Sequence, residues 1–438
     1  MKTDISVAYS EDEKVRRSLK ASFWDGAFAS GMTGFTQEYF TPFLLLIGGS
    51  ARQVGILNAL QNLAASLTQL KSADLTVYLR SRKKMFNFFV FLQAFILLPM
   101  CLAALYCFVS PFAFISLAAL FAGFGALALP AWGSLMSDLV PVDKRGSYFG
   151  WRNKITGLIT VAVALLAGFI LNQVGAVDRC TAFAILFGSA FIFRLASWYF
   201  LTRMHEPALK HNKEDQFTIY MFLARLKESN FAKFVLFVAF MNFSVNLASP
   251  FFPVLMIRDF HFSYMLYAVI TVTATLTVCL MISRWGRLAD KIGNLKVINT
   301  TAPLIGVIPL LWILNHHPAF LFFAQVFSGF AWAGFNLCAS NFIYDAVTPE
   351  KRTRCIAYFN LFNGLALCLG SLLGGLLLAH LPPLLGFNIL TLFLISSLLR
   401  MGIGFMGPLF LKEVRSVEHI SNVDVFRSVV GVRMRGLR

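Results

Sequence analysis

The chain has 438 residues, of which 58% are hydrophobic and 13% are charged, and its mean hydropathy is +0.69. A soluble domain carries about 25% charged residues, so this composition excludes a protein whose surface faces only water. The formal net charge of +17 raises the alternative of a nucleic-acid partner, but the basic residues form no reader motif with interleaved aromatic residues, and we expect no nucleic acid.

Long apolar runs recur along the whole chain. Each has about the 20 residues needed to cross a hydrocarbon core of about 30 Å. The runs are too long for membrane-barrel strands of about 10 residues, and they do not alternate. Because helices satisfy their own backbone hydrogen bonds in lipid, the predicted fold is an all-α membrane protein with twelve transmembrane helices, at residues 21–47, 53–77, 85–109, 112–137, 147–173, 179–203, 232–257, 263–283, 296–314, 318–345, 355–379 and 387–411.

Basic residues are distributed unevenly between the two sides of these spans. Residues 1–20 contain no apolar stretch of the kind found in a cleaved signal peptide. With the N-terminus in the cytoplasm, 31 of the 38 lysine and arginine residues lie on the cytoplasmic side, which is the positive-inside pattern. We therefore expect an integral, multi-pass protein of a bacterial inner (cell) membrane with both termini cytoplasmic.

The first span contains two carboxylates, Asp25 and Glu38. Ionisable residues within the lipid layer are candidates for function. Glu38 lies past the middle of the span, and Pro42 indicates a break in the helix beside a cavity. Both acids are candidates for proton coupling or solute binding, with Glu38 the first candidate and a gate or helix-start role preferred for Asp25. The alternatives are a structural pair between Glu38 and an outer arginine, and a gate or helix-start role for Asp25.

The stretch SDLVPVDKRGSYFGWRN, residues 137–153, places charges between two apolar runs. Asp138 ends the fourth span, and Arg145, seven residues later, begins the fifth. Arg152 lies deeper in the fifth span. There it either reaches the inner surface with its long side chain or lines a substrate cavity that attracts anionic solutes.

Two further features of the chain leave alternatives open. Arg194 and Arg400 lie within the sixth and twelfth spans, where we expect them to reach toward the inner surface or to pack between helices. The cysteines predict no disulfide framework. Cys107 and Cys180 both fall near outer ends of spans, so a disulfide between them is the one pairing that the sequence leaves open.

The chain contains an internal repeat. A shift of 207 residues places Asp138 on Asp345 and Arg145 on Arg352, and like residues coincide around them. Each repeat has six spans, so both run in the same direction through the membrane. The predicted organisation is a first half at 1–203 with a cytoplasmic tail at 1–20, a cytoplasmic linker with an amphipathic helix at 204–231, a second half at 232–411 and a basic cytoplasmic tail at 412–438.

Polar residues also gather within spans of the second half. Asn242 and Asn246 are four residues apart on one face of the seventh span, and Trp332 and Asn336 repeat this spacing in the tenth. Amides and an aromatic ring on two helices fit a substrate cavity. Hydrogen bonding between helices is the competing interpretation of the asparagines.

The stretch GRLADKIGNLK, residues 286–296, carries a resemblance to a known family. Gly286, Asp290, Lys291 and Gly293 match the loop signature of the major facilitator superfamily. With twelve spans in two halves, the chain resembles that superfamily over essentially its whole membrane part. The first-half copy departs from the signature, because Tyr78 stands at the position of Asp290.

The resemblance implies a gate at the cytoplasmic ends of the helices. Its expected members are Asp138, Arg145, Gly286, Asp290, Lys291, Gly293, Asp345 and Arg352. Partly exposed ion pairs are worth about 0.2–1 kcal/mol each, which suits contacts that open and close. The competing interpretation is that these charges anchor the topology and cap the helices. Asp290 is expected at a helix start, and the two glycines are expected to allow a tight turn.

These features predict a non-enzymatic secondary transporter. We expect it to move a small organic solute across the lipid bilayer by alternating access, with protons as coupling ion, as a monomer and without a cofactor or metal. No phosphate-binding loop is present in the sequence, so the driving force is a gradient. The alternative is a receptor or assembly factor that keeps this fold without transporting.

Overall fold

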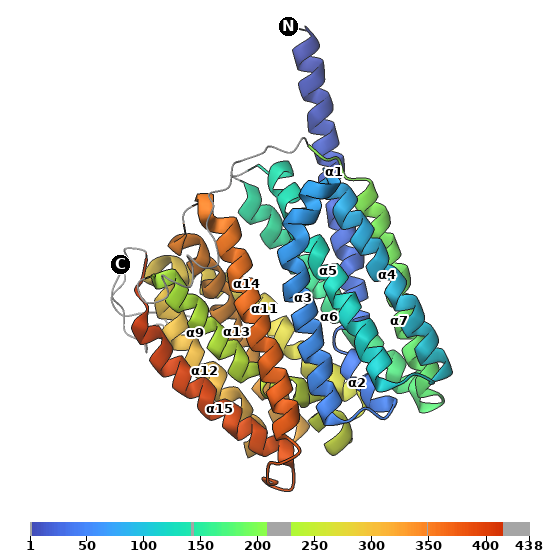
Figure 1. Cartoon of the computed structure of the whole chain (residues 1–438), viewed down its shortest axis with the longest axis vertical. Coiled ribbons are helices and arrows are strands. Elements are labelled where there is room, and N and C mark those ends of the chain that lie inside the picture. Colours follow the sequence, from blue (N-terminus) through green and yellow to red (C-terminus); the bar gives the residue numbers. More distant parts are fainter. Residues whose placement is uncertain (1, 142–143, 208–228, 348, 415–438) are drawn as a thin grey trace. The chain divides into compact units, whose positions relative to one another are not determined.

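A computed structural model describes the chain apart from residues 1, 142–143, 208–228, 348 and 415–438; the side chains of residues 2–12, 73, 146 and 349–354 are also outside the description. Over the described residues the regular structure is helical (Figure 1), with one isolated bridge between Leu384 and Phe387. The amphipathic helix predicted within 204–231 and most of the basic tail at 412–438 fall outside the described residues.

The helices of the first half begin at recognisable caps. The Ser81 hydroxyl accepts a hydrogen bond from the amide of Lys84, and the Ser110 hydroxyl accepts one from that of Ala113, which satisfies amides that have no partner within the helix. The elements are α1 (Lys2–Thr36), α2 (Phe40–Leu46), α3 (Ala51–Leu79), α4 (Arg82–Tyr106), α5 (Pro111–Leu139), α6 (Arg145–Gln173), the 3₁₀ turn η2 (Val174–Ala176) and α7 (Arg179–Thr202).

The second half repeats this order of helices. Its first helix is interrupted after Asn246 and continues through short 3₁₀, α and π segments. The elements are α9 (Asn230–Asn246), η3 (Ser249–Phe251), α10 (Phe252–Val254), η4 (Leu255–Asp259), α11 (Tyr264–Ile292), α12 (Asn294–Leu314), α13 (Pro318–Ala346), α14 (Pro349–Leu377), α15 (Asn388–Met406) and η5 (Gly407–Phe410).

Within the described part of the chain, ten helices are long and apolar enough to cross a membrane. The other two predicted spans correspond to α1 with α2 and to α3. These helices carry more polar residues than the rest; α3 contains Arg52, Lys71 and Asp74. The prediction of an all-helical membrane fold is confirmed.

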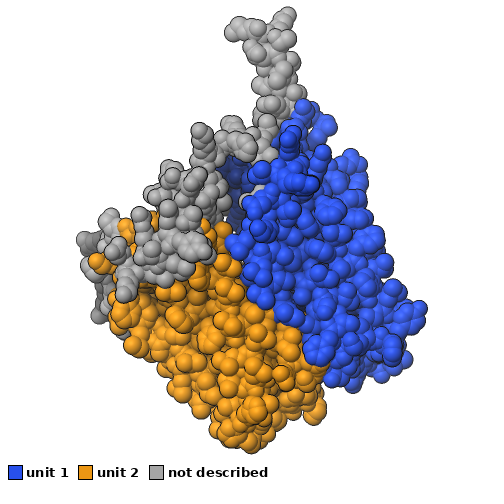
Figure 2. Space-filling view, viewed as in Figure 1, with its two compact units in different colours: residues 1–49, 60–212, 263–268 blue, residues 50–59, 213–262, 269–438 orange. Residues whose placement is uncertain are grey.

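The chain forms two compact units, which have different colours in Figure 2. Unit 1 comprises residues 1–49, 60–212 and 263–268, and unit 2 comprises 50–59, 213–262 and 269–438. Each has its own apolar core, with Phe86 and Leu135 in that of unit 1 and Trp285 and Phe342 in that of unit 2.

Equivalent helices pack in the same way in both repeats. In the first half α1 packs on α6 and α7, and α4 packs on α5 and α7. In the second half α9 packs on α14 and α15, and α12 packs on α13 and α15. These pairs correspond one to one under the repeat, which confirms two halves built on one plan.

A disulfide joins Cys107 to Cys180 in unit 1, with 5.6 Å between their Cα atoms. Cys107 ends α4 in the left-handed backbone region, with φ of 48°, and Cys180 lies in the first turn of α7. The pairing that the sequence left open is therefore present, and it ties the neighbouring ends of these two helices.

Candidate functional site

Unit 1 contains a cavity of about 330 Å³ among five of its helices, α1, α4, α5, α6 and α7. Charged and polar side chains line part of it, including Asp25, Gln93, Arg152 and Arg194. Ligand pockets of this kind combine a mostly apolar wall with a few fixed polar groups. Of the residues predicted for coupling or the substrate cavity, the structure brings Asp25 and Arg152 together here.

Asp25 is buried between three helices. Its Oδ2 lies 3.5 Å from Nη2 of Arg152 on α6, and its Oδ1 accepts a 2.7 Å hydrogen bond from the Ser197 hydroxyl on α7. Only 5% of Asp25 is exposed. A carboxylate placed this deep needs partners, so the helix-start alternative does not describe its surroundings.

Arg152 is fixed from several sides. Its Nε and Nη2 each donate to the Ser22 carbonyl at 3.2 Å. The guanidinium also lies 4.6 Å from the centre of the Trp132 ring on α5, which is a cation–π distance. Gly26 makes room for it on α1, because a Cβ there would overlap the guanidinium. Arg152 therefore lines the cavity rather than reaching for the surface.

Arg194 also lines this cavity, and it packs between helices, which is one of the two placements that the sequence left open for it. Its side chain does not reach the inner surface; it is 8% exposed and lies within unit 1. Its Nη1 donates to the Ser197 hydroxyl at 3.1 Å, and its Nη2 donates to Oε1 of Gln93 at 2.5 Å. Ser197 therefore bridges Arg194 to Asp25. Burial in this network outweighs the gain from reaching water.

Glu38 lies in the turn of residues 37–39 that separates α1 from α2. A break in the helix was predicted from Pro42, which lies four residues after Glu38, and the turn is that break. The Glu38 carbonyl accepts a 2.6 Å hydrogen bond from the Tyr267 hydroxyl within unit 1. No ion pair of Glu38 occurs among the described residues, and Arg258, one proposed partner, pairs with Asp259.

The polar residues predicted for a cavity in the second half lie against neighbouring helices. Asn242 donates to Oδ1 of Asn363 on α14 at 3.1 Å, and Oδ1 of Asn246 accepts from Ser371 at 3.3 Å. Trp332 packs on the core of unit 2, and Asn336, four residues later, is exposed. These contacts fit the interpretation of the two helix α9 asparagines as links between helices.

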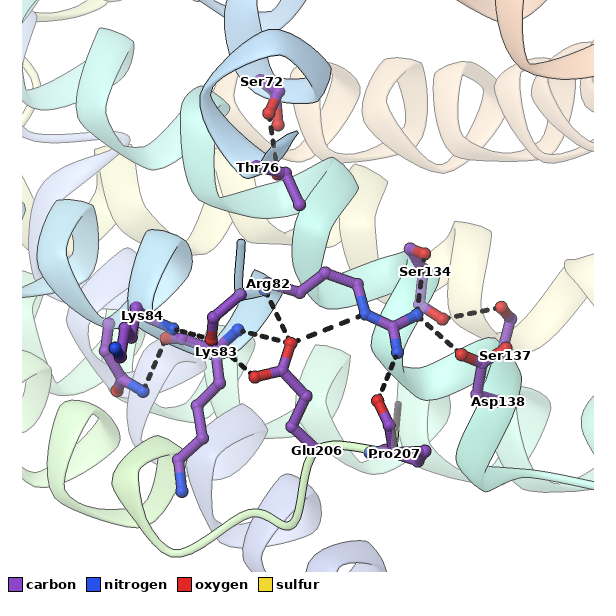
Figure 3. A network of polar contacts seen from close by, with 12 residues as sticks. Ser72, Thr76, Arg82, Lys83, Lys84, Ser134, Ser137, Asp138, Glu206 and Pro207 are labelled. Atoms are coloured by element: carbon purple, nitrogen blue, oxygen red, sulfur yellow. Dashed lines mark hydrogen bonds and ion pairs between the residues drawn. The ribbon is translucent and has the colours of Figure 1, made fainter. Parts of the chain in front are cut away.

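A second polar cluster lies at the ends of α4 and α5 (Figure 3). Arg82, which is 3% exposed, places its Nη1 2.6 Å from Oδ2 of Asp138. Glu206, just after α7, accepts from the Arg82 amide at 2.6 Å and from the Ser81 hydroxyl at 2.5 Å. Asp138 thus pairs with Arg82 and not with Arg145, the other charged gate residue predicted at this junction.

Arg145 has a different role in this cluster. Its Nε donates to the Val140 carbonyl at 3.1 Å, and its Nη2 donates to the Ser137 carbonyl. It therefore holds the connection between α5 and α6. The spacing of seven residues places Asp138 at the end of α5 and Arg145 at the start of α6. It does not make the two side chains face each other.

The second half contains the equivalent cluster. Asn294, the first residue of α12, donates to Oδ2 of Asp345 at 2.7 Å, as Arg82 does to Asp138. Glu413, which follows the last helix, accepts from the Leu295 amide at 2.7 Å, as Glu206 does at α4. The acids Glu206 and Glu413 are themselves 207 residues apart. The side chain of Arg352 lies outside the described residues.

The loop signature takes a shape that differs from the expectation. Helix α11 continues to Ile292, so Gly286 is inside the helix and Asp290 and Lys291 lie in its last turn, not at a helix start. Gly293 alone separates α11 from α12. Its φ of 90° and ψ of 158° are open to glycine, so this is the residue that makes the tight turn.

Several residues of the two candidate sites were missing from the sequence prediction. They are Arg82, Gln93, Trp132, Ser197, Glu206, Asn294 and Glu413. A signal did exist for the two glutamates, because the same repeat shift that identified Asp138 and Asp345 also aligns them. The remaining residues depend on which helix faces which, and no spacing along the chain reports that.

The chain matches the family model described as the Major Facilitator Superfamily twice, over residues 26–244 and 232–424. A search of curated protein sequences finds no match. Solved structures with a similar fold include a nucleoside transporter, NupG, with TM-score 0.68 and 14% identity, covering 91% of this chain and 98% of that one.

Two further structures share the fold. A D-xylose-proton symporter has TM-score 0.68 and 13% identity, covering 93% of this chain and 99% of that one. The human organic anion transporter MFSD10 (TETRAN) has TM-score 0.59 and 15% identity, covering 91% and 99%. With both repeats matched by the family model, this chain belongs to the Major Facilitator Superfamily of membrane transporters.

Proposed function

We propose that this transporter is a gradient-driven secondary transporter that moves a small organic solute by alternating access with protons as the coupling ion. The observation that carries the proposal is the ion pair of Asp25 and Arg152 inside the unit-1 cavity. Ionisable groups within the lipid layer are costly and mark solute or proton pathways. In this cavity a buried acid that can carry a proton lies beside a buried base that can bind a solute.

The geometry supports Asp25 over Glu38 as the residue that carries the coupled proton. At 3.5 Å the Asp25–Arg152 contact is a long ion pair, and protonation of Asp25 would release Arg152 to a solute. Glu38 lies in a turn outside the residues that line this cavity. Both acids remain candidates, and they can be separated by experiment.

The clusters around Arg82 and Asn294 support a gate at the inner ends of the helices. Each joins the start of one helix to the end of the next and to a glutamate beyond the sixth helix of its half. Contacts with exposed members, such as the 44% exposed Asp138 side chain, are weak enough to break and re-form. We place both clusters on the cytoplasmic face of a bacterial inner membrane and expect a monomer.

The test uses the full-length protein in proteoliposomes with an imposed pH gradient. The solute panel contains a nucleoside, a pentose and organic anions, which are the classes named for the structural neighbours. Asp25→Asn should keep solute exchange but lose accumulation driven by the pH gradient, because the amide cannot carry the proton. Glu38→Gln is the matched control and should retain accumulation.

Other outcomes would change the assignment. Loss of accumulation in Glu38→Gln alone would move the coupling role to Glu38. Accumulation at the wild-type level in both variants would contradict coupling through either acid. If no solute of the panel exchanges in the wild-type protein while it remains folded, the alternative of a non-transporting receptor or assembly factor would be favoured.

A further inference from the structure

The unit-1 cavity carries more positive than negative charge. Among the residues that line it, Arg152 and Arg194 are cationic and Asp25 is the anionic one. Asp25 contacts Arg152 at 3.5 Å and reaches Arg194 only through the Ser197 hydroxyl. With Asp25 ionised, the cavity therefore holds one uncompensated positive charge in a medium of low dielectric, where an unbalanced ion is costly.

Two residues that line the same cavity each carry a buried hydrogen-bond donor without an acceptor. Nε of Arg194 and Nε1 of Trp132 are both buried and have no hydrogen-bond partner in the described part of the chain. The whole Arg194 residue is 8% exposed. A buried donor without an acceptor destabilises the fold, and does so more strongly when the group is charged. Both features favour a ligand that brings acceptor atoms and a negative charge.

The remaining wall shows what else the ligand contains. Val90, Ala128 and Leu129 give an apolar surface, and the Trp132 ring adds an aromatic one. A volume of about 330 Å³ exceeds the 150 Å³ or so in which an engineered cavity holds benzene. The cavity can therefore hold the body of a small organic molecule as well as its charged group.

We infer that the unit-1 cavity binds a small monoanionic organic acid, whose carboxylate is held by Arg194 and Trp132 beside Arg152. The inference rests on the proposed transport function and names its substrate class. While Asp25 is ionised, one negative charge balances the single excess positive charge. A phosphate monoester carries about −1.5 to −2 at neutral pH, which would leave the filled cavity negatively charged in that state.

The repeat supplies a control for the role of Arg194. Arg400, 206 residues after Arg194, is the mid-helix arginine of the corresponding span in the second half and is 2% exposed. Its Nε donates to the Ser396 hydroxyl and its Nη2 to the Val245 carbonyl, both at 3.0 Å. Arg400 is thus a buried arginine in the other unit, and its described contacts link α15 to α9. Its removal tests the general effect of deleting a buried guanidinium.

Binding is measured by the thermal stabilisation of the purified full-length protein at fixed ionic strength. The probes are two acid–amide pairs, benzoate with benzamide and lactate with lactamide, and phenyl phosphate. We expect at least one acid to stabilise the protein saturably and its amide to bind about 10-fold more weakly or worse, because the amide lacks the charge that the cavity balances. Equal stabilisation by acid and amide in both pairs, or a preference for phenyl phosphate over benzoate, would overturn the inference.

Variants assign the residues. Arg194→Gln should weaken acid binding by about 10- to 100-fold and Trp132→Phe by about 2- to 10-fold, whereas Arg400→Gln should leave it within about twofold. If Arg194→Gln does not fold, the comparison of acid and amide in the wild-type protein and the binding of the acid to Trp132→Phe still test the proposed anion site. Unchanged binding in both cavity variants would overturn the assignment.

Exchange of the labelled acid in proteoliposomes separates the two proposals. Binding of an acid without exchange would contradict transport while supporting the anion site. Exchange of neutral solutes in a protein that neither binds nor exchanges acids would support transport and overturn the anion site.

Discussion

At the residue scale, two glycines of one motif have opposite structural requirements. Gly293 has a φ of 90° and a ψ of 158°, a region that residues with a side chain rarely enter, and a Cβ there would overlap the Glu413 carboxylate. Gly286 is helical, and a Cβ there would meet Leu337 Cδ2 at 3.5 Å, an ordinary contact. The motif therefore needs one glycine for the backbone and tolerates a side chain at the other.

This difference predicts that alanine substitutions at the two positions change stability in opposite directions. Gly293→Ala should destabilise the protein by about 1–3 kcal/mol from backbone strain alone, with a further loss if Glu413 moves away from the Leu295 amide. Gly286→Ala should be neutral or stabilising by up to about 1 kcal/mol, because alanine is the better helix former. Thermal unfolding of both variants in the same detergent is the measurement. Equal destabilisation would show that Gly286 meets a constraint absent from this description.

At the element scale, the sequence predicted which segments are helices but not how their ends meet. Helices α4, α5 and α7 begin within three residues of the predicted spans, because run length and the capping residues Ser81, Ser110 and Asp178 are local signals. The first helix of each half breaks at an equivalent place, at 37–39 and after Asn246. A nearby proline follows each break, Pro42 and Pro250, so this feature too is visible locally.

What local patterns could not supply is the rotation of each helix against its neighbours. Arg82 meets Asp138 and Glu206, which lie 56 and 124 residues further along the chain. The position of Arg194 within its span left open whether its side chain reaches for water or packs between helices. Its burial depends on Gln93 from α4 and Ser197 from its own helix facing it within the packed unit. Contacts of this kind become predictable only when the packing is known.

The disulfide between α4 and α7 gives a prediction for these two elements. A disulfide persists in an oxidising compartment, so the ends that carry Cys107 and Cys180 should lie on the outer side. In intact cells a membrane-impermeant thiol reagent should label these cysteines only after reduction. The variant Cys107→Ser should leave Cys180 labelled without reduction, and a double serine variant gives the background. Labelling of the wild-type pair without a reductant would show that the disulfide does not form in the cell.

At the scale of the whole molecule, the repeat connects packing, charge and topology. Four helix pairs recur in both halves, and so do the inner-end clusters around Arg82 and Asn294. Two copies with an even number of spans share one direction in the membrane, so the loops that follow the even-numbered spans all open to the same side. The proposed linker at 204–231 is consistent with this shared direction, because it starts after the sixth span and ends before the seventh on the same side of the membrane.

The orientation of the whole chain is the last prediction. With 31 of 38 lysine and arginine residues on one side, the positive-inside pattern places the N-terminus, the 204–231 linker and the C-terminus in the cytoplasm. Reporter fusions after residues 174, 212 and 438 should therefore be outside, inside and inside. The fusion after residue 174 tests the same face as the disulfide, since η2 ends four residues before Cys180. The reverse pattern would place the Arg82 and Asn294 clusters on the outer side and would contradict a cytoplasmic gate.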